Sequence, residues 1–431
     1  MSQSPRYDQC LTEMYGLRRF GIQLELETIA AILAGLGQPQ NRFRSIHLAG
    51  TNGKGSIAAM LSAIFHAAGY RVGRYTSPHL IRFNERITIN EQPVSDEAVV
   101  TAYEAVRGRH GNGRQPTFFE YTTAMAFHEF ARQQVDLAVI ETGMGGRYDA
   151  TNVISPELCL ISNISLEHQL YLGSTLAAIA REKAGIIKPG IPLVTGVSQK
   201  SARQVIAAAT KANRAPLYIR GPHFKTRRNS ASDRFTYYGL AAVYRDLQTS
   251  LAGRHQQVNA SLALAACEVL TQRGWKIPEE AIRRGLAATR WPARLETISR
   301  NPLVLIDGAH NLMAATSLAQ YLRLHLDDTP LTLIIGILDD KAYAVILQTL
   351  APFCRRIIVT RAETGRAVPP DTLAAAARQL TDTVAVTRSV EAAIDLALAD
   401  LPPKEVLCIA GSLYVAGEAR AVFIKKGWIR E

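Results

Sequence analysis

The sequence contains few cysteines, and none of them is spaced for a disulfide or zinc framework. Its 431 residues include only five, at Cys10, Cys159, Cys267, Cys354 and Cys408. No two form a Cys-x-x-Cys pair, the usual sign of structural zinc, and they are too sparse for a small disulfide-stapled domain. Cys159 and Cys408 lie inside apolar runs, as buried free thiols usually do. We therefore expect a reducing compartment and predict a cytoplasmic protein.

Long apolar stretches are also missing. The longest apolar run, LTLIIGIL at 331–338, is far shorter than the roughly 20 residues of a membrane-spanning helix. The first residues, MSQSPRYDQC, lack the apolar core of a signal peptide. The sequence therefore predicts no membrane partner and no secretion.

The remaining composition is that of an ordinary globular protein. Apolar residues make up 47%, charged residues 20% and aromatic residues 7%, which excludes a collagen, a coiled coil and wholesale disorder. The formal net charge is +12, which favours either a polyanionic ligand or a solvated basic surface. The basic residues form no long run and no pattern of a nucleic-acid-binding module, so we expect no nucleic-acid partner.

Strand-like and helix-like segments alternate along most of the chain, which predicts an α/β fold with largely parallel sheets. A strand at 44–49 leads through a glycine-rich turn into a helix at 56–68, and further strands are expected at 71–76, 136–141 and 158–163. The pattern weakens at 221–255, where hairpin strands are possible. It breaks at 289–302 and then resumes as a doubly wound series. We predict two domains, 1–296 and 297–431.

The strongest local signal is the sequence SIHLAGTNGKGSIAAML at 45–61. A glycine-rich turn between a strand and a helix directs backbone N–H groups and the positive helix end toward an anion, and Lys54 adds a full charge. The turn is not a strict Walker A motif, because Leu48 stands in place of the first glycine and Gly55 separates Lys54 from Ser56. A simple tight turn is the alternative, but a phosphate site fits these residues better.

Several further motifs follow in order, and together they resemble one known family. They are GTNGKGS at 50–56, YTSPHLIRFNERI at 75–87, TFFEY at 117–121, VIETGMGGRYDATN at 139–152, ISNISLEHQLYLG at 161–173, EKAGIIKPG at 182–190, WPARLE at 291–296, LIDGAHN at 305–311 and GILDDK at 336–341. The chain resembles the folylpolyglutamate synthase and dihydrofolate synthase family, relatives of the Mur ligases. The resemblance implies an N-terminal P-loop-type ATPase domain and a C-terminal Rossmann-like domain.

The resemblance also implies a reaction. ATP phosphorylates the carboxylate of dihydropteroate or of a reduced folate, and the amine of L-glutamate attacks the acyl phosphate to form an amide. ATP, Mg²⁺ and these small molecules are the implied ligands, and a monomer is the implied assembly. A bifunctional enzyme is the most economical interpretation. A monofunctional folylpolyglutamate synthase, a Mur-type ligase and a non-catalytic nucleotide-binding protein remain alternatives.

The family pattern assigns the nucleotide and metal contacts. The implied ATP-binding residues are Gly50, Thr51, Asn52, Gly53, Lys54, Gly55, Ser56, Asn259, Arg294 and Asp307, and the implied metal ligands are Ser77, Glu141 and His168. Glu141 has independent support, because it ends an apolar strand and so reaches the edge of a parallel sheet where ligands bind. Asp307 could instead cap a helix, and His168 could be an ordinary hydrogen-bonded histidine.

Two further residues are assigned to catalysis by resemblance alone. The family pattern implies that Lys183 is carbamylated, whereas the sequence alone indicates a cation at a helix end. It also implies that His310 lies on the glutamate side of the reaction. A site built from both domains would close on ATP by domain movement and exclude water.

The same pattern indicates a pterin site. Its implied contacts are Ile22, Leu24, Thr117, Phe119, Glu120, Arg147 and Asp149. Phe119 suits stacking on a flat heterocycle, although an aromatic residue at a helix start is more often part of a core. The chain departs from the family pattern at Glu25, where glycine is usual, at Glu167, where aspartate is commoner, and at Leu312, where proline is usual.

Overall fold

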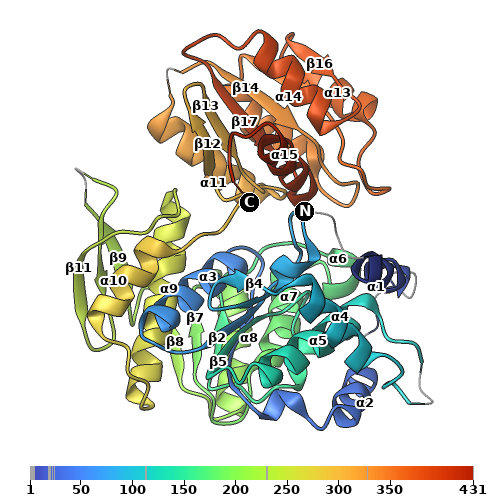
Figure 1. Ribbon diagram of the computed structural model, residues 1–431. Helices are drawn as coiled ribbons and strands as arrows, with labels where there is room; N and C mark the ends of the chain where they lie inside the picture. The colour runs from blue at the N-terminus through green and yellow to red at the C-terminus, as the bar shows by residue number, and fades with distance from the viewer. Residues whose placement is uncertain are drawn as a thin grey trace. The chain divides into compact units, whose positions relative to one another are not determined.

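The computed structural model describes residues 5–17, 21, 23, 25–111, 114–229, 232–327 and 329–430. The chain divides into two compact units (Figure 1). Unit 1 comprises residues 1–250 and 257–289, and unit 2 comprises residues 251–256 and 290–431. The division predicted after residue 296 falls a few residues later than this one, just inside strand β12 (Glu296–Arg300).

Unit 1 is built on an eight-stranded sheet. Its strand order is β4 (Gln92–Pro93), β3 (Ile87–Ile89), β2 (Val72–Tyr75), β5 (Leu137–Glu141), β1 (Arg44–Ala49), β6 (Leu158–Ile161), β7 (Leu193–Thr195) and β8 (Leu217–Ile219). The strands from β2 to β8 run parallel, and β3 and β4 extend the sheet antiparallel at one edge. The predicted α/β class with largely parallel strands is confirmed.

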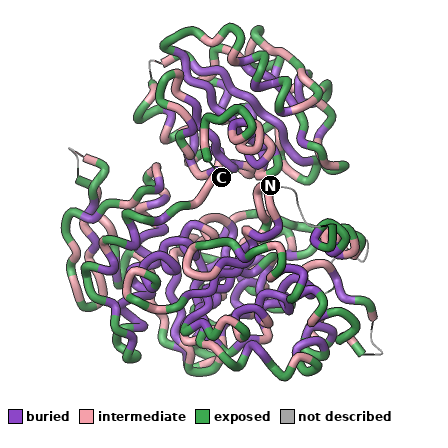
Figure 2. The backbone as a smooth tube through the Cα atoms, viewed as in Figure 1, coloured by how far each residue is buried: buried purple, intermediate pink, exposed green. Residues whose placement is uncertain are grey.

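Helices cover this sheet and bury its strands. The helices of unit 1 are α1 (Pro5–Gly16), α2 (Glu27–Gly35), α3 (Lys54–Ala67), α4 (Asp96–Val106), α5 (Phe118–Arg132), α6 (Gln169–Leu172), α7 (Leu176–Lys183), α8 (Lys200–Ala212), α9 (Arg254–Gln272) and α10 (Glu279–Ala288). Helix α10 packs closely on α3, since Gly285 lies against the backbone of Ile64. Helix α3 is therefore buried on nearly every side, and the strands of the sheet form the buried centre of the unit in Figure 2.

A small antiparallel sheet replaces the weak pattern at 221–255. Its order is β11 (Val243–Leu247), β10 (Phe235–Tyr238) and β9 (Lys225–Arg228), so the two hairpin strands expected there are joined by a third. Glu268 on α9 anchors the hairpin, accepting hydrogen bonds from the Tyr237 hydroxyl at 2.6 Å and from the backbone N–H of Leu240 at 2.8 Å. Such fully bonded buried carboxylates fix loop position.

Unit 2 is a doubly wound domain, as predicted. Its sheet order is β12, β13 (Leu303–Ile306), β17 (Val406–Ala410), β14 (Leu331–Ile335), β15 (Arg356–Val359) and β16 (Val384–Val386). Its helices are α11 (Leu312–His325), α12 (Tyr343–Leu350), α13 (Pro370–Arg378), α14 (Val390–Ala399) and α15 (Leu413–Lys425). Strand β12 pairs antiparallel with β13, so the apparent break in the sequence pattern includes an edge strand.

Two expectations from composition can be compared with the structure. All five cysteines are free thiols, and four of them are buried. Among the helices of the described residues, none has the length and apolar character that a bilayer crossing requires.

Candidate active site

The phosphate loop joins β1 at the centre of the unit 1 sheet to α3, as the sequence predicts. Two of its glycines have positive φ, 143° at Gly50 and 86° at Gly53. A Cβ at Gly50 would collide with the Ser162 hydroxyl, and one at Gly53 would lie 2.5 Å from Oδ1 of Asn259. Both positions therefore require glycine, and Asn259 on α9 lies directly beside the loop.

Lys54 curls back over this loop. Its Nζ donates to the carbonyl oxygens of Gly50 at 2.9 Å and Thr51 at 3.3 Å, and it lies 3.8 Å from Oε1 of Glu141. The neighbouring Ser56 hydroxyl is buried and has no hydrogen-bond partner within the described part of the chain. A buried polar atom without a partner is costly, so Ser56 is suited to contact a ligand oxygen or a metal.

The end of β6 braces the loop from the adjacent strand. Asn52 donates its N–H to Oδ1 of Asn163 at 3.0 Å, and the Ser162 hydroxyl donates to the carbonyl of Asn52 at 2.7 Å. The N–H of Thr51 donates to the carbonyl of Asn163 at 2.9 Å. Sequence reasoning did not single out Ser162 and Asn163, although both stand in the motif at 161–173, where their position after a strand was the available signal.

The predicted metal ligands lie on three neighbouring segments. Glu141 is buried at the end of β5, and the N–H of Ser77, in the loop after β2, lies 3.4 Å from its Oε2. His168 is exposed and precedes α6 with a left-handed backbone, at a φ of 44°. Within the described ranges no group of three His, Cys, Asp or Glu side chains is placed to hold a metal ion. The predicted set has only two such side chains, so the metal site stays a prediction.

Lys183 ends α7, as the sequence alone indicates, but its side chain is buried. Its residue is 1% exposed, its Nζ donates to the carbonyl of Gly50 at 2.9 Å, and it pairs with Oε1 of Glu167 at 2.6 Å. Burial lowers the pKa of Lys183, and the charge of Glu167 opposes that shift. Burial would raise the pKa of Glu167, but the charges of Lys183 and Lys54 lower it to about 2.

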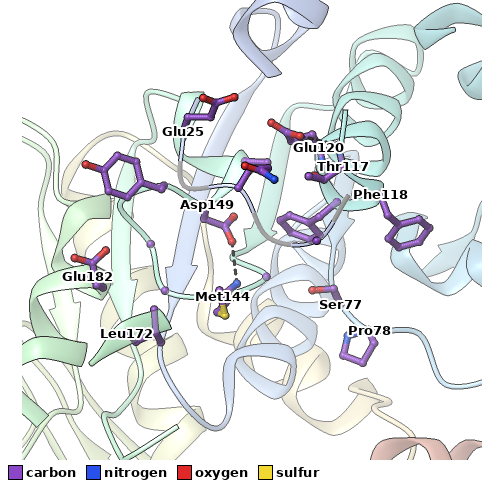
Figure 3. A pocket seen from close by; sticks show the side chains of 18 of the residues that line it. Glu25, Ser77, Pro78, Thr117, Phe118, Glu120, Met144, Asp149, Leu172 and Glu182 are labelled. Carbon is purple, nitrogen blue, oxygen red and sulfur yellow. Dashed lines mark hydrogen bonds between the residues drawn. The ribbon is translucent and has the colours of Figure 1, made fainter. Parts of the chain in front are cut away.

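A cavity of about 410 Å³ opens beside Ser77 (Figure 3). Its lining includes four of the predicted pterin contacts, Thr117, Phe119, Glu120 and Asp149. Arg147 does not line it, and its guanidinium lies 3.8 Å from Glu182 instead. Ile22 and Leu24 lie outside the described residues. Sequence reasoning missed several lining residues, which come from segments distant in the chain: Arg86, Met144, Tyr148, Leu172 and Glu182.

Carboxylates dominate the charged lining of this cavity. Among the described residues, Glu25, Glu120, Asp149 and Glu182 line it together with Arg86. Arg114 holds both oxygens of Glu120, at 2.8 and 2.9 Å, and also pairs with Glu25, one of the departures from the family pattern. Burial raises the pKa of Asp149. The cavity is therefore suited to a flat, uncharged molecule rich in hydrogen-bond donors, and poorly suited to an anion.

The predicted residues of unit 2 lie around the end of β13. Asp307 is buried, and its two oxygens accept from the N–H groups of Leu295 at 2.8 Å and Ala309 at 2.9 Å. Burial raises the pKa of Asp307, against the nearby charge of Arg294. The alternative role of Asp307 as a helix cap is wrong, because Asn311 caps α11 by accepting from Ala314.

His310 stands in the same loop of unit 2. Its Nδ1 lies 2.8 Å from the carbonyl of Gly308, which fixes the orientation of the ring. A ring nitrogen bonded to a carbonyl must carry the proton, so Nε2 is left as an acceptor when the ring is neutral.

Comparison with known proteins decides the family. The Mur ligase middle domain family matches residues 48–267, and the Mur ligase, glutamate ligase domain family matches residues 293–413. The chain is 38% identical over 429 residues to a folylpolyglutamate synthase of Lacticaseibacillus casei, with 97% of this chain and 99% of that protein covered. The chain belongs to the folylpolyglutamate synthase/dihydrofolate synthase family.

Two further proteins of the family are similar over most of their length. A dihydrofolate synthase/folylpolyglutamate synthase of Bacillus subtilis is 38% identical over 361 residues, covering 81% of this chain and 84% of that protein. The structure of a Mycobacterium tuberculosis folylpolyglutamate synthase complexed with ADP and AMPPCP superimposes with a TM-score of 0.90 at 36% identity, covering 97% of this chain and 99% of that one. The chain is thus an ATP-dependent ligase that forms a C–N bond, and the predicted fold is confirmed.

We expect Lys54→Ala to lower ADP formation by at least about a hundredfold, because it removes the α3 lysine that curls over the phosphate loop. Glutamate-dependent ADP release measures the effect, and thermal unfolding checks that the variant folds. Lys211→Ala, which removes an exposed lysine of α8, is the control. Near-normal turnover of a folded Lys54→Ala variant would refute the assignment.

Proposed function

We propose that this ligase is bifunctional and adds L-glutamate both to dihydropteroate and to reduced folates. The observation that carries the proposal is the cavity, which has an aromatic and carboxylate lining suited to a pterin head group and shares Ser77 with the phosphate-loop side of the sheet. The name of the Bacillus subtilis relative, which includes both activities, supports it. One cavity can serve both reactions because the two substrates share this head group.

The proposed chemistry is a phosphoryl transfer followed by an acyl transfer. A carboxylate oxygen of the pteroate or folate attacks the γ-phosphorus of ATP, forming an O–P bond while the bond to ADP breaks. The amine of glutamate then attacks the acyl carbon, a C–N bond forms, and phosphate leaves as the amine loses a proton. Lys54 and the N–H groups at the start of α3 would hold the phosphates in line for the first step, together with Asn259 beside the loop.

Unit 2 contributes three residues to the proposal. We infer that Arg294 and Asp307 bind nucleotide and that His310 contacts glutamate during catalysis. The support is their position at the carboxyl end of β13, where ligands of doubly wound sheets bind. A monomer acting in the cytoplasm completes the proposal, on the family resemblance and the five free thiols.

A magnesium ion fits the residues next to Lys54. The Ser56 hydroxyl is buried without a partner in the described residues, and Glu141 supplies a buried carboxylate oxygen near the loop. Ser77, Glu141 and His168 would hold the ion with phosphate oxygens and water, since Mg²⁺ keeps several ligands of this kind. When bound, the ion would neutralise the charge that develops on the transferring phosphoryl group.

We expect Glu141→Gln or His168→Ala to raise the Mg²⁺ concentration for half-maximal activity by about tenfold or more. Removing a carboxylate or imidazole ligand weakens the binding of Mg²⁺ but leaves the phosphate loop intact. Titrating the metal at saturating ATP measures the shift. His66→Ala, an exposed histidine of α3, should behave like the parent. Superimposable titration curves for parent and variants would remove these residues from the metal site.

Carbamylation of Lys183 remains part of the proposal. A neutral amine attacks CO₂, an N–C bond forms, and one proton is released, so a buried amine with a lowered pKa is suited to the reaction. The resulting anion would lie near the proposed metal. Glu167, 2.6 Å away, opposes it, because it stabilises the protonated amine.

Labelled bicarbonate tests this modification. We expect a ¹³C carbamate resonance in the parent that Lys183→Gln lacks and that Lys200→Gln, an exposed lysine at the start of α8, retains. No resonance in the parent at saturating bicarbonate, or a resonance that survives Lys183→Gln, would contradict carbamylation at this position.

The substrate assignment is tested by ADP release measured separately with dihydropteroate and with tetrahydrofolate, each with and without L-glutamate. We expect glutamate-dependent release with both, because one cavity accommodates the shared head group. Lys54→Ala gives the background. Release with tetrahydrofolate alone would make the enzyme a monofunctional folylpolyglutamate synthase, and release with neither would overturn the assignment.

A further inference from the structure

A buried hydrogen-bonded chain runs from the middle of the unit 1 sheet to the cavity. His47, in the centre of β1, is fully buried, and its Nε2 lies 2.8 Å from the hydroxyl oxygen of Thr151. That hydroxyl is 2.5 Å from Oδ1 of Asp149, which lines the cavity. Neither His47 nor Thr151 lines the cavity, so any effect they have on a ligand passes through Asp149.

The direction of the hydrogen bonds follows from the chemistry of the three groups. A carboxylate only accepts, so the single proton of the Thr151 hydroxyl is donated to Asp149, and the hydroxyl oxygen must accept from Nε2–H of His47. Burial and the nearby charge of Lys188 lower the pKa of His47 to about 3, so the ring is neutral. Its one proton therefore lies on Nε2.

Only one of the two ring nitrogens of His47 is hydrogen-bonded within the described residues. Nδ1 is buried and has no hydrogen-bond partner within the described residues. In register, His47 is flanked by Ile140 on β5 and Cys159 on β6, both fully buried. Leucine or valine would pack in such surroundings without an unpaired polar atom, so the imidazole lowers the stability of the fold relative to them. The hydrogen bond from Nε2 to Thr151 is the interaction that neither of them could make.

Asp149 is held by further donors that fix its orientation. Oδ1 accepts from both the N–H and the hydroxyl of Thr151, at 3.1 and 2.5 Å, and Oδ2 accepts from the N–H of Met144 at 2.9 Å (Figure 3). Oδ1 is thereby occupied from the protein side. The N–H of Gly143 also donates to this carboxylate. A donor that enters the cavity would approach Oδ2, which is not bonded to Thr151. The adjacent N–H groups of a pterin ring are donors of that kind.

We propose that His47 and Thr151 are positioning residues that hold the Asp149 carboxylate in place as the acceptor for the pterin head group. The proposal rests on the role proposed above for Asp149. The chain from β1 through Thr151 fixes one carboxylate oxygen, so the other is presented to the cavity without a search among rotamers. The donated hydrogen bonds also favour the charged form of Asp149, in opposition to burial, which raises its pKa.

Thr151→Val tests the chain, because it removes the hydroxyl and preserves the shape. We expect the dissociation constant and the KM for dihydropteroate to rise about tenfold, with the KM for ATP unchanged, since a hydrogen bond to a charged acceptor is lost. Thr151→Ser restores the hydroxyl and should bind like the parent. Thr88→Val removes a buried hydroxyl that has no partner in the described residues and serves as the control.

The pH dependence of pterin binding gives a readout that a structural role would not move. Loss of the Thr151 hydroxyl raises the pKa of Asp149 further, so the acidic limb of binding should move to higher pH in Thr151→Val. The other titratable groups that act on this chain are Lys183 and Tyr75 at Asp149 and Lys188 at His47, and all are unchanged in the variant. In Thr88→Val the acidic limb of pterin binding should lie at the same pH as in the parent.

Two further variants separate the possible failures. If Asp149→Asn binds dihydropteroate normally, the role proposed for Asp149 is wrong. If Asp149→Asn weakens binding and Thr151→Val does not, the positioning chain is wrong and the role of Asp149 stands. Should Thr151→Val fail to fold, a comparison of His47→Gln with His47→Leu decides. Glutamine keeps a hydrogen-bond donor and should retain the affinity for dihydropteroate, whereas leucine should lose it. Equal affinities of the two variants would overturn the proposal.

Discussion

The carbonyl oxygen of Gly50 accepts hydrogen bonds from two lysines, Lys54 and Lys183, each at 2.9 Å. This shared acceptor connects the phosphate loop to the end of α7, a helix that follows β6 in the chain. Two ammonium groups so close together repel each other, and the arrangement is tolerated because Glu167 and Glu141 lie next to them. The cluster fixes the carbonyl of Gly50 and the side chain of Lys54 in the phosphate loop, and it depends on a residue 50 without a Cβ.

The loop could be predicted from the sequence because its determinants are contiguous. Strand, glycine turn, lysine and helix follow one another within 45–61, and each has a local signature. Glu141 was found for a similar reason, since it ends an apolar strand and the carboxyl ends of parallel strands share one edge. The alternation of strands and helices likewise indicated both units, because parallel strands buried on both faces are apolar throughout.

The cavity could not be assembled in the same way. Its lining comes from segments near residues 21–25, 77–86, 117–120, 143–150 and 172–182, and no periodicity in the sequence brings these together. Asp307 shows the same limit, because a carboxylate after a strand can cap a helix or bridge two loops. The cap at Asn311 and the hydrogen bond from Leu295 decide between them. Helix α1 also escaped detection, since it is short and buries only Tyr7, Cys10 and Met14.

The charges of unit 1 also bear on how a substrate lies in the site. Within the described residues the cavity presents four carboxylates and Arg86, whereas the phosphate loop presents Lys54 and the positive end of the α3 dipole. Consider a molecule that is uncharged and rich in donors at one end and anionic at the other. It is repelled when its anionic end faces the carboxylates of the cavity and attracted when that end faces the phosphate loop. The acceptors of the cavity would bind the pterin end, and the basic loop would attract the carboxylate end. The positive potential of the phosphate loop favours the nucleotide phosphates. The same potential would therefore draw the substrate carboxylate toward the phosphate that activates it.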